Sequence, residues 1–364
     1  MARTKATTVE ISERRLENQR LTRVVPGRPA DVVSWLGAVQ AQEYDAAKWA
    51  IGLRLPDGTV DADVEAAFNE GRILRTHVMR PTWHFVAPAD IHWLLALTAP
   101  RVQRAMSPYN QRLELDSRTL TRGVAIVERA LRDRCYLTRS EVGERLQRGG
   151  LGMAGQRLAQ LMMHAELERV ICSGPRRGRH FTYALLAERA PDARSMSRDE
   201  ALATLGQRFF RSHGPATVRD FVWWSGLTTT DAKRALEMIA ARREDIGGRS
   251  YWTYGPAPRG AVRDDVAHVL PIYDEYLVAY RDRDAVPHGP STLASSGPRP
   301  VTFQHAIILR GQVAGTWRTT RRAGEISMHA IPLRRLGRAE RGAVGQAVRR
   351  YERFVSAGVT LTIG

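Results

Sequence analysis

The chain has 364 residues, 43% of them hydrophobic and 26% charged, which is the composition of an ordinary globular protein. A chain of this length can bury a substantial core and predicts more than one compact unit. No apolar run approaches the roughly 20 residues that a membrane helix needs, and the first residues, MARTKATTVEISERR, lack the apolar core of a signal peptide. We therefore expect a cytoplasmic protein with no membrane partner. Cys135 and Cys172 match no metal-ligand spacing and are expected to be reduced thiols.

The positive charge is large: 55 Lys and Arg against 38 Asp and Glu give a net charge of +17. Only Lys5, Lys48 and Lys233 are lysines, so arginine supplies nearly all of it. A GC-rich coding bias explains the choice of arginine but not the excess over acidic residues. A charge of this size favours a polyanionic partner, nucleic acid above all, and a merely basic surface is the alternative.

Residues 1–115 form the first predicted unit. Its predicted elements are, in chain order, the helices 11–21, 30–39 and 61–71 and the strands 73–79 and 82–87 on either side of Arg80-Pro81. Residues 45–55 resume helical character after the stretch AVQAQEYDAA, which interrupts the helices. This unit is therefore expected to be a modified copy of the units that follow.

Residues 116–190 form the second predicted unit. Apolar residues at helical spacing predict a helix over 120–132, and Thr138 with Glu141 form a capping box that opens a short helix. A third helix over 155–170 precedes two strands in ICSGPRRGRHFTYAL, which flank a basic turn over 174–179. Three helices followed by a two-stranded wing are typical of the winged-helix variant of the helix-turn-helix.

Residues 191–265 repeat this pattern and form the third predicted unit. A helix is predicted over 198–213, and Thr217 with Asp220 form a capping box at the start of TVRDFVWWSG. Thr229 or Thr230 is expected to cap a helix over 231–243, and the residues 247–255 are expected to form a strand or wing.

Residues 266–364 differ in character. The stretch HVLPIYDEYLVAY is hydrophobic and aromatic, 282–300 is a Gly/Pro/Ser-rich loop, and 306–331 predicts three short strands before a helix over 339–355. A small β-barrel or sheet would close this part. The expected fold class is therefore α+β, with tandem winged-helix units and a C-terminal small β-barrel.

Gln40 and Gln42 lie two residues apart among small and apolar residues. On one continuous helix, residues i and i+2 point about 200° apart and cannot serve one site. In an extended segment they face the same way. Two interpretations stay open: surface glutamines on a continuous helix, or a break between two helices where both amides converge on one site.

Other catalytic patterns are scarce in the sequence, which contains no P-loop, GxGxxG after a strand, HExxH or GxSxG. His77 and His84 lie in neighbouring predicted strands and are expected to be hydrogen-bonded rather than metal ligands. Alternation along TWHFV places Thr82 and His84 on one face of their strand, where they are candidates to line a site. A half-exposed strand is the alternative.

Four segments taken in order carry a resemblance to a known family: QAQEYDAAKWAIGLRL, LRTHVMRPTWHFVAPADIHWLL, LPIYDEYLVAYRDR and GTWRTTRR. Over nearly the whole chain the sequence resembles the AlkZ-like winged-helix DNA glycosylases of bacteria, which excise alkylated bases and unhook interstrand crosslinks. The resemblance implies tandem winged helices around a C-terminal β-barrel in a C-shaped DNA cradle. It also implies a catalytic Gln-apolar-Gln motif, which Gln40-Ala41-Gln42 matches, whereas a sister branch carries Gln-apolar-Asp.

This resemblance implies a monofunctional glycosylase for N7-alkylguanine and N3-alkyladenine, without a metal or cofactor, acting as a nucleoid-associated monomer on double-stranded DNA in antibiotic self-resistance. A cationic alkylated base leaves readily, so a glutamine need only orient the attacking water and cannot act as an ionised base. Uracil and 8-oxoguanine should then not be released. Glu43 and Asp45 are the rival carboxylates for the catalytic role.

Several arginines are expected to contact DNA phosphates, and solvated surface charge is the alternative for each. They are Arg157, Arg169, Arg176, Arg177 and Arg179 in the second unit and Arg318, Arg321 and Arg322 in the C-terminal hairpin. The rival to the enzyme is a winged-helix transcription regulator with a C-terminal effector-sensing module. A regulator would bind one DNA sequence tightly and release no base.

Overall fold

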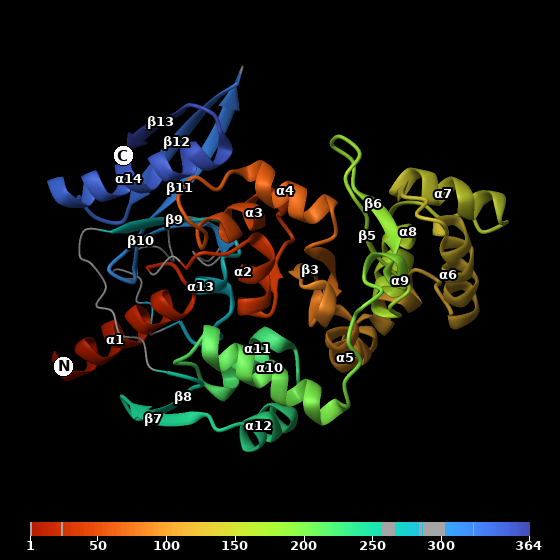
Figure 1. Cartoon of the computed structure of the whole chain (residues 1–364), viewed down its shortest axis with the longest axis horizontal. Helices are drawn as coiled ribbons and strands as arrows, with labels where there is room; N and C mark the ends of the chain where they lie inside the picture. Colours follow the sequence, from red (N-terminus) through yellow and green to blue (C-terminus); the bar gives the residue numbers. More distant parts are fainter. Residues whose placement is uncertain (1, 23–24, 257–265, 284–285, 287–302, 323) are drawn as a thin grey trace. The chain divides into compact units, whose positions relative to one another are not determined.

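The computed structural model describes residues 2–22, 25–256, 266–283, 286, 303–322 and 324–364 (Figure 1). The chain divides into two compact units, and each is described by itself. Unit 1 comprises Met1–Glu65, Ala203–Trp224 and Thr228–Gly364, and unit 2 comprises Ala66–Leu202 and Ser225–Leu227. Both combine helices with small sheets, so the α+β class is confirmed. None of the helices within the described ranges is long and apolar enough to span a membrane.

Unit 1 begins with the helices α1 (Ala2–Asn18), α2 (Pro29–Leu36) and α3 (Tyr44–Gly52), with the two-residue strand β1 (Val39–Gln40) between the last two. Pro29 occupies the first turn of α2, where its missing N–H costs nothing. Gly37 follows with a φ of 84°, a conformation that glycine adopts at no steric cost, and the helix ends there. The interpretation of one continuous helix through Gln40 is therefore wrong, and the alternative interpretation, a break between two helices, is correct.

The next part of unit 1 contains α10 (Arg198–Ser212), α11 (Val218–Ser225), α12 (Thr229–Met238) and the hairpin of β7 (Arg242–Ile246) and β8 (Arg249–Thr253). The capping box at the start of α11 is confirmed, since the N–H of Asp220 donates to Thr217 Oγ1 at 3.1 Å.

Two details of α12 differ from the sequence prediction. Thr228, rather than Thr229 or Thr230, caps α12, because only Thr228 has a carboxylate three residues later, that of Asp231, to complete the exchange. The helix also ends at Met238, before the predicted end at residue 243, and Arg242 and Arg243 belong to β7.

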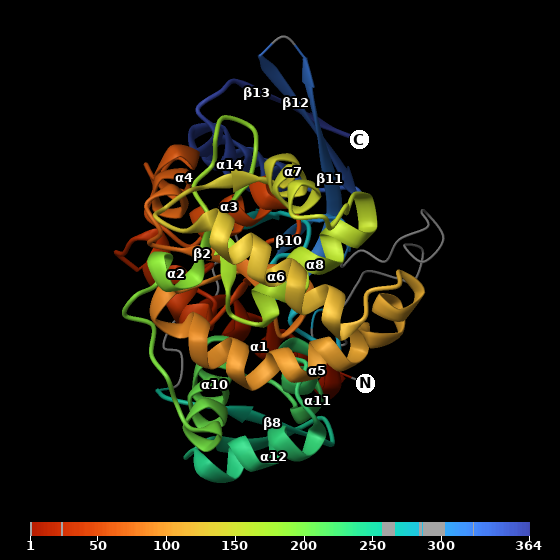
Figure 2. The same ribbon diagram turned by 90° about the vertical axis from the view of Figure 1, so that its right-hand side faces the viewer.

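The C-terminal sheet of unit 1 has the strand order β13-β12-β11-β10-β9. Its strands are, in chain order, β9 (Ala267–Leu270), β10 (His305–Leu309), β11 (Gln312–Arg322), β12 (Glu325–Pro332) and β13 (Val359–Ile363). All neighbours are antiparallel except β12 and β13. In Figure 2 the β11–β12 hairpin extends as a long arm. The loop predicted over 282–300 lies largely outside the described residues.

The predicted β-barrel is, over the described strands, an open sheet with β9 and β13 at its edges. The helix α14 (Arg338–Val355) supplies the physical reason, because it contacts β9 and β13 and covers one face of the sheet (Figure 1). Its buried side chains include Val344, Val348 and Phe354. A sheet whose apolar face is covered by a helix does not need to close on itself to bury that face.

Unit 2 begins with the C-terminal part of α4 (Asp61–Asn69) and the antiparallel hairpin of β2 (Leu74–Val78) and β3 (Arg80–Val86), in which Thr76 pairs with His84. A short 3₁₀ turn, η1 (Pro88–Asp90), leads into α5 (Ile91–Arg112). This 22-residue helix was not predicted, and it packs on β2, β3 and α8.

The remainder of unit 2 follows the order predicted for residues 117–186. Its elements are α6 (Ser117–Leu131), β4 (Leu137–Thr138), α7 (Arg139–Arg148), α8 (Gly155–Leu167), β5 (Ile171–Ser173), β6 (Thr182–Leu185) and α9 (Leu186–Arg189). Strand β4 adds to the two predicted strands, in the order β4-β6-β5. The predicted capping box of Thr138 and Glu141 is present, and Val127, Val142 and Leu161 lie in a single core.

Candidate active site

Gln40 and Gln42 lie in the short segment between α2 and α3, Gln40 at the end of β1 and Gln42 in the bend that follows. Gln40 is 7% exposed and Ala41 is fully buried, whereas Gln42 and Glu43 are exposed. The segment therefore runs from the interior of unit 1 to its surface over three residues. Glu43 is the N-cap of α3, so the second glutamine stands immediately before a helix start.

The backbone of Gln40 is held by a buried carboxylate that the sequence analysis did not single out. The N–H of Gln40 donates to Glu275 Oε1 at 2.8 Å, and the indole N–H of Trp224 donates to Glu275 Oε2 at 2.9 Å. His213 Nε2 lies 3.5 Å from the same oxygen. Burial lowers the pKa of His213 in spite of this neighbour, which favours a neutral ring. Glu275 thus fixes the position of the main chain at Gln40.

Asp274, beside Glu275, belongs to a second buried network. It caps α13 (Glu275–Val278) and forms a two-bond ion pair with Arg54, each bond 2.8 Å long. Arg54 also donates to the backbone oxygen of Gln19 at 3.0 Å, to the side chain of Gln19 at 2.9 Å and to the backbone oxygen of Ala50 at 2.7 Å. All five N–H groups of the guanidinium donate a hydrogen bond. Arg54 therefore links the residue after α1, the helix α3 and the N-cap of α13. The signal in the sequence was two adjacent carboxylates in an apolar stretch.

The rival carboxylates Glu43 and Asp45 are both exposed. Asp45 lies 3.3 Å from Lys48, whose ammonium group also donates to Asp61 at 2.7 Å and to Glu65 at 2.8 Å. Burial opposes the charge of Lys48, but the hydrogen bonds to Asp61 and Glu65 outweigh it and raise its pKa. This lysine is therefore a charged anchor between α3 and α4.

Thr82 and His84 lie on β3 in unit 2, whereas the two glutamines belong to unit 1. His84 is fully buried; its Nδ1–H donates to the backbone oxygen of Thr82 at 2.9 Å, and Arg80 lies 3.4 Å from its other nitrogen. Burial and then Arg80 hold the pKa of His84 well below its usual value. His84 is therefore a neutral, hydrogen-bonded core histidine. Thr82 Oγ1 is buried without a hydrogen-bond partner among the described residues.

The arginines expected at DNA in unit 2 have different surroundings. Arg157 and Arg177 each form an ion pair with a glutamate, at 3.3 Å and 2.7 Å. Arg176 is half-buried and donates to the backbone oxygen of Arg179 at 3.0 Å. Arg179 and Arg169 are exposed. Only some of these arginines thus present a guanidinium outwards, and others hold the turn between β5 and β6.

The arginines Arg318, Arg321 and Arg322 lie on the outer part of β11 and are exposed. They follow Trp317, which is 4% exposed and donates to the backbone oxygen of Leu270 at 2.8 Å. The inner part of the strand is thus fixed in the sheet, and the charges stand on the projecting arm (Figure 2).

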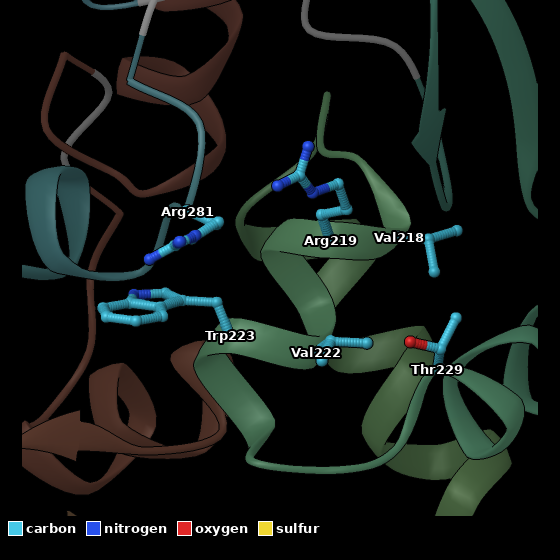
Figure 3. A pocket seen from close by; sticks show the side chains of 6 residues that line it. All are labelled: Val218, Arg219, Val222, Trp223, Thr229 and Arg281. Carbon is cyan, nitrogen blue, oxygen red and sulfur yellow. The ribbon is translucent and has the colours of Figure 1, made fainter.

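A further cationic surface of unit 1, absent from the sequence analysis, surrounds a hollow of about 230 Å³ on α11 (Figure 3). The guanidinium of Arg281 lies over the indole of Trp223, 5.2 Å from the ring centroid, and Arg219 rises from the same helix. The backbone N–H of Arg281 donates to the buried Asp220 at 2.9 Å. Asp220 therefore fixes this arginine beside α11.

Known proteins resemble this chain in sequence and in fold. The family described as "DNA glycosylase AlkZ-like" matches residues 33–354. A protein of Streptomyces sahachiroi named "Interstrand DNA cross-link repair glycosylase" is 25% identical over 336 residues, which cover 83% of this chain and 85% of that protein. The solved structure of the Streptomyces sahachiroi DNA glycosylase AlkZ superposes with a TM-score of 0.79 at 21% identity over 99% of each chain, a likeness of fold. The chain therefore belongs to the AlkZ-like family of DNA glycosylases, which are hydrolases that act on N-glycosyl bonds.

Proposed function

We propose that this chain is a monofunctional DNA glycosylase that hydrolyses the N-glycosidic bond of cationic N-alkylated purines. N7-alkylguanine and N3-alkyladenine are the proposed substrates, including bulky adducts and interstrand crosslinks formed by natural alkylating agents. The name of the Streptomyces relative supports crosslinks as substrates. The biological role that we propose is self-resistance to an alkylating antibiotic.

The observation that carries this proposal is the position of Gln40 and Gln42 in the non-helical segment between α2 and α3, where Glu275 accepts the backbone N–H of Gln40. An alkylated purine already bears a positive charge and leaves without a general acid. The remaining task is to place a water near C1′ of the sugar, and a glutamine oxygen accepts a hydrogen bond from such a water while its NH₂ donates to a phosphate. Neutral amides suffice because the lesion brings its own charge.

Lys48 supports hydrolysis by water rather than attack by an enzyme amine. A lysine nucleophile needs a lowered pKa so that the free amine is present at neutral pH. The pKa of Lys48 is raised, and its ammonium group is engaged by Asp61 and Glu65. We therefore assign Lys48 to structure, and borohydride should trap no covalent complex between this lysine and an abasic sugar.

DNA binding is assigned to the basic surfaces. Residues 117–186 have the element order α6-β4-α7-α8-β5-β6, and residues 198–253 follow a similar order. We propose that both are winged helices, a fold that commonly binds duplex DNA. Arg179 and the three arginines of the β11–β12 hairpin are exposed and suited to phosphate or to the minor groove. Thr82 stays a proposed site residue, whereas the fully buried His84 is assigned to the core.

The test compares two duplexes that differ in one base. With N7-methylguanine, the protein should release free base and leave an alkali-labile abasic site, whereas a matched duplex with uracil should stay intact. Robust release of uracil would contradict the role of neutral amides. Tight binding to one DNA sequence with no base released from either duplex would instead favour a regulator.

A further inference from the structure

Two arginines of unit 1, Arg20 and Arg211, share one tryptophan ring. The guanidinium carbon of Arg20 lies 4.1 Å from the ring centroid of Trp35, and that of Arg211 lies 4.6 Å from it. The indole is fixed, because its N–H donates to the backbone oxygen of Asn18 at 2.7 Å. All three side chains of this group are half-buried. Two cations are thus held together at one rigid ring.

Neither guanidinium bonds to an anion of the protein. Over the part of the chain that the structure describes, neither donates a hydrogen bond or forms an ion pair, and Nε of Arg211 is buried without a partner. Burial and then the charge of Arg211 lower the pKa of Arg20, and Asp31 opposes this shift less strongly. Burial and then Arg208 lower the pKa of Arg211. Two cations that bond to no carboxylate favour an anion that a ligand brings.

The backbone at Arg20 is a second, independent observation. Arg20 follows α1 with a φ of 59°, in the left-handed region. Its N–H donates to the backbone oxygen of Glu17 at 2.9 Å, and the N–H of Leu21 donates to that of Leu16 at 2.8 Å, which is the Schellman arrangement at a helix end. Glycine usually occupies this position, because a side chain there is strained. Strained positions of this kind concentrate at ligand-binding sites.

We propose that Arg20 and Arg211 together bind one phosphate group of the DNA backbone. A guanidinium that stacks on a ring keeps the N–H groups of its edge available, and these match the oxygens of a phosphate. The inference rests on the proposed function, because Trp35 is in the last turn of α2, the helix that precedes the segment of Gln40. A phosphate held here gives the duplex a defined position relative to that segment, without reading its sequence.

The first test is the salt dependence of binding to an undamaged duplex, measured by fluorescence anisotropy. The slope of log Kd against log salt counts the neutralised phosphates, at about 1 for each. Because the two arginines share one phosphate, the double variant Arg20→Gln/Arg211→Gln should lower the slope by about 1. The double variant Arg20→Lys/Arg211→Lys retains both charges and should keep most of the slope. An unchanged slope, or a loss of about 2, in the glutamine variant would overturn the proposal.

The matched control is an arginine that already has its anion within the protein. Arg334 has a side chain that is 59% exposed, and it donates to Glu340 at 2.8 Å. This hydrogen bond raises the pKa of Arg334, in contrast to the lowered pKa values of Arg20 and Arg211. Arg334→Gln should therefore keep the wild-type slope. A loss of slope as large as that of the double glutamine variant would show that any arginine has this effect, and would refute a specific site.

A second measurement separates binding from folding. Arg20→Gly removes the side chain and places glycine at a positive φ, so its urea midpoint should equal or exceed that of the wild type. Its affinity for the duplex should nevertheless fall as in Arg20→Gln. A lowered midpoint with unchanged affinity would assign Arg20 to structure and overturn the proposal.

A third arm separates DNA from free phosphate as the ligand. If millimolar inorganic phosphate raises the Tm of the wild type at constant ionic strength but not that of the double glutamine variant, and the DNA slopes do not differ, the arginines bind free phosphate and the proposal is wrong. Base release from N7-methylguanine is measured in parallel. Equal slopes with base released refute the phosphate site alone, whereas a lowered slope in the double glutamine variant with no base released by the wild type refutes the proposed function alone.

Discussion

Two charged regions of this molecule are built in opposite ways. In the interior of unit 1, the guanidinium of Arg54 is buried and all five of its N–H groups donate hydrogen bonds, two of them to Asp274. On the β11–β12 hairpin, Arg318, Arg321 and Arg322 are exposed. The guanidinium of Arg54 is satisfied within the protein, whereas those of the hairpin are open to solvent. A buried and fully hydrogen-bonded arginine belongs to the scaffold, and exposed arginines on a projecting hairpin are the ones that we propose for contact with DNA phosphates.

The largest expected effect is on the scaffold. Asp274→Asn removes the charge partner of Arg54 and leaves a buried guanidinium uncompensated, which costs about 3–5 kcal/mol of unfolding free energy. Urea denaturation measures this loss. Asp245→Asn serves as the control, because Asp245 is 62% exposed and solvent screens its ion pair with Arg243, so the substitution should change stability little. Equal effects of both substitutions would refute the distinction between the scaffold and the surface.

A smaller loss of stability, with a functional consequence, is expected at Glu275. Glu275→Gln turns one oxygen into an NH₂ group that faces an N–H donor, either that of Gln40 or that of Trp224. The cost should be about 1–3 kcal/mol. Displacement of the Gln40 main chain should slow base excision on the order of 10- to 100-fold in single-turnover assays. Glu237→Gln on the exposed side of α12 is the matched control, and unchanged excision in Glu275→Gln would remove Glu275 from the positioning role.

The pH dependence of stability tests the interior of unit 1 next. Burial, and then Arg350, lower the pKa of His268 to about 4 from its usual 6.5. Between these values the unfolded chain binds a proton that the folded protein excludes. Stability is therefore complete above about pH 6.5 and falls by about 2 kcal/mol on acidification to about pH 5. Urea denaturation of wild type and His268→Gln at both pH values measures this, since glutamine does not titrate. An identical pH dependence in both proteins would contradict the assignment.

The smallest effect on stability is expected on the β11–β12 hairpin. Arg321 is exposed, so Arg321→Gln should change the unfolding free energy little. Urea denaturation measures this change. A loss as large as that of Asp274→Asn would place Arg321 in the scaffold instead.

Much of the fold was predictable because it depends on local patterns. Apolar spacing located the helices of residues 117–186, and Thr138 with Glu141 marked a helix start that the structure confirms. The break after α2 was one of two open interpretations, and Gly37 decides it through its positive φ, a local signal that we did not use. The N-cap of α12 lies before the predicted Thr229 or Thr230, because only Thr228 has a carboxylate three residues later, that of Asp231. This signal was also local and was also not used.

The remaining features depend on contacts between distant parts of the chain. Glu275 meets Gln40 across 235 residues, and Arg54 meets Asp274 across 220, and no local pattern encodes such pairs. The closure of the C-terminal strands was misjudged for the same reason, since α14 covers the face that a barrel would have enclosed. Composition gave the positive charge but did not distinguish Arg176, which bonds within its own turn, from the exposed Arg179.

The central claim is that two neutral amides, rather than a carboxylate, place the attacking water. Single-turnover release of N7-methylguanine should be measured for Gln40→Ala, Gln42→Ala, Glu43→Gln and Asp45→Asn, with circular dichroism as the check on folding. The account predicts that each glutamine variant loses on the order of 10- to 100-fold in rate and that both carboxylate variants stay within about threefold of the wild type. Loss of activity in Glu43→Gln together with intact Gln40→Ala and Gln42→Ala would contradict it.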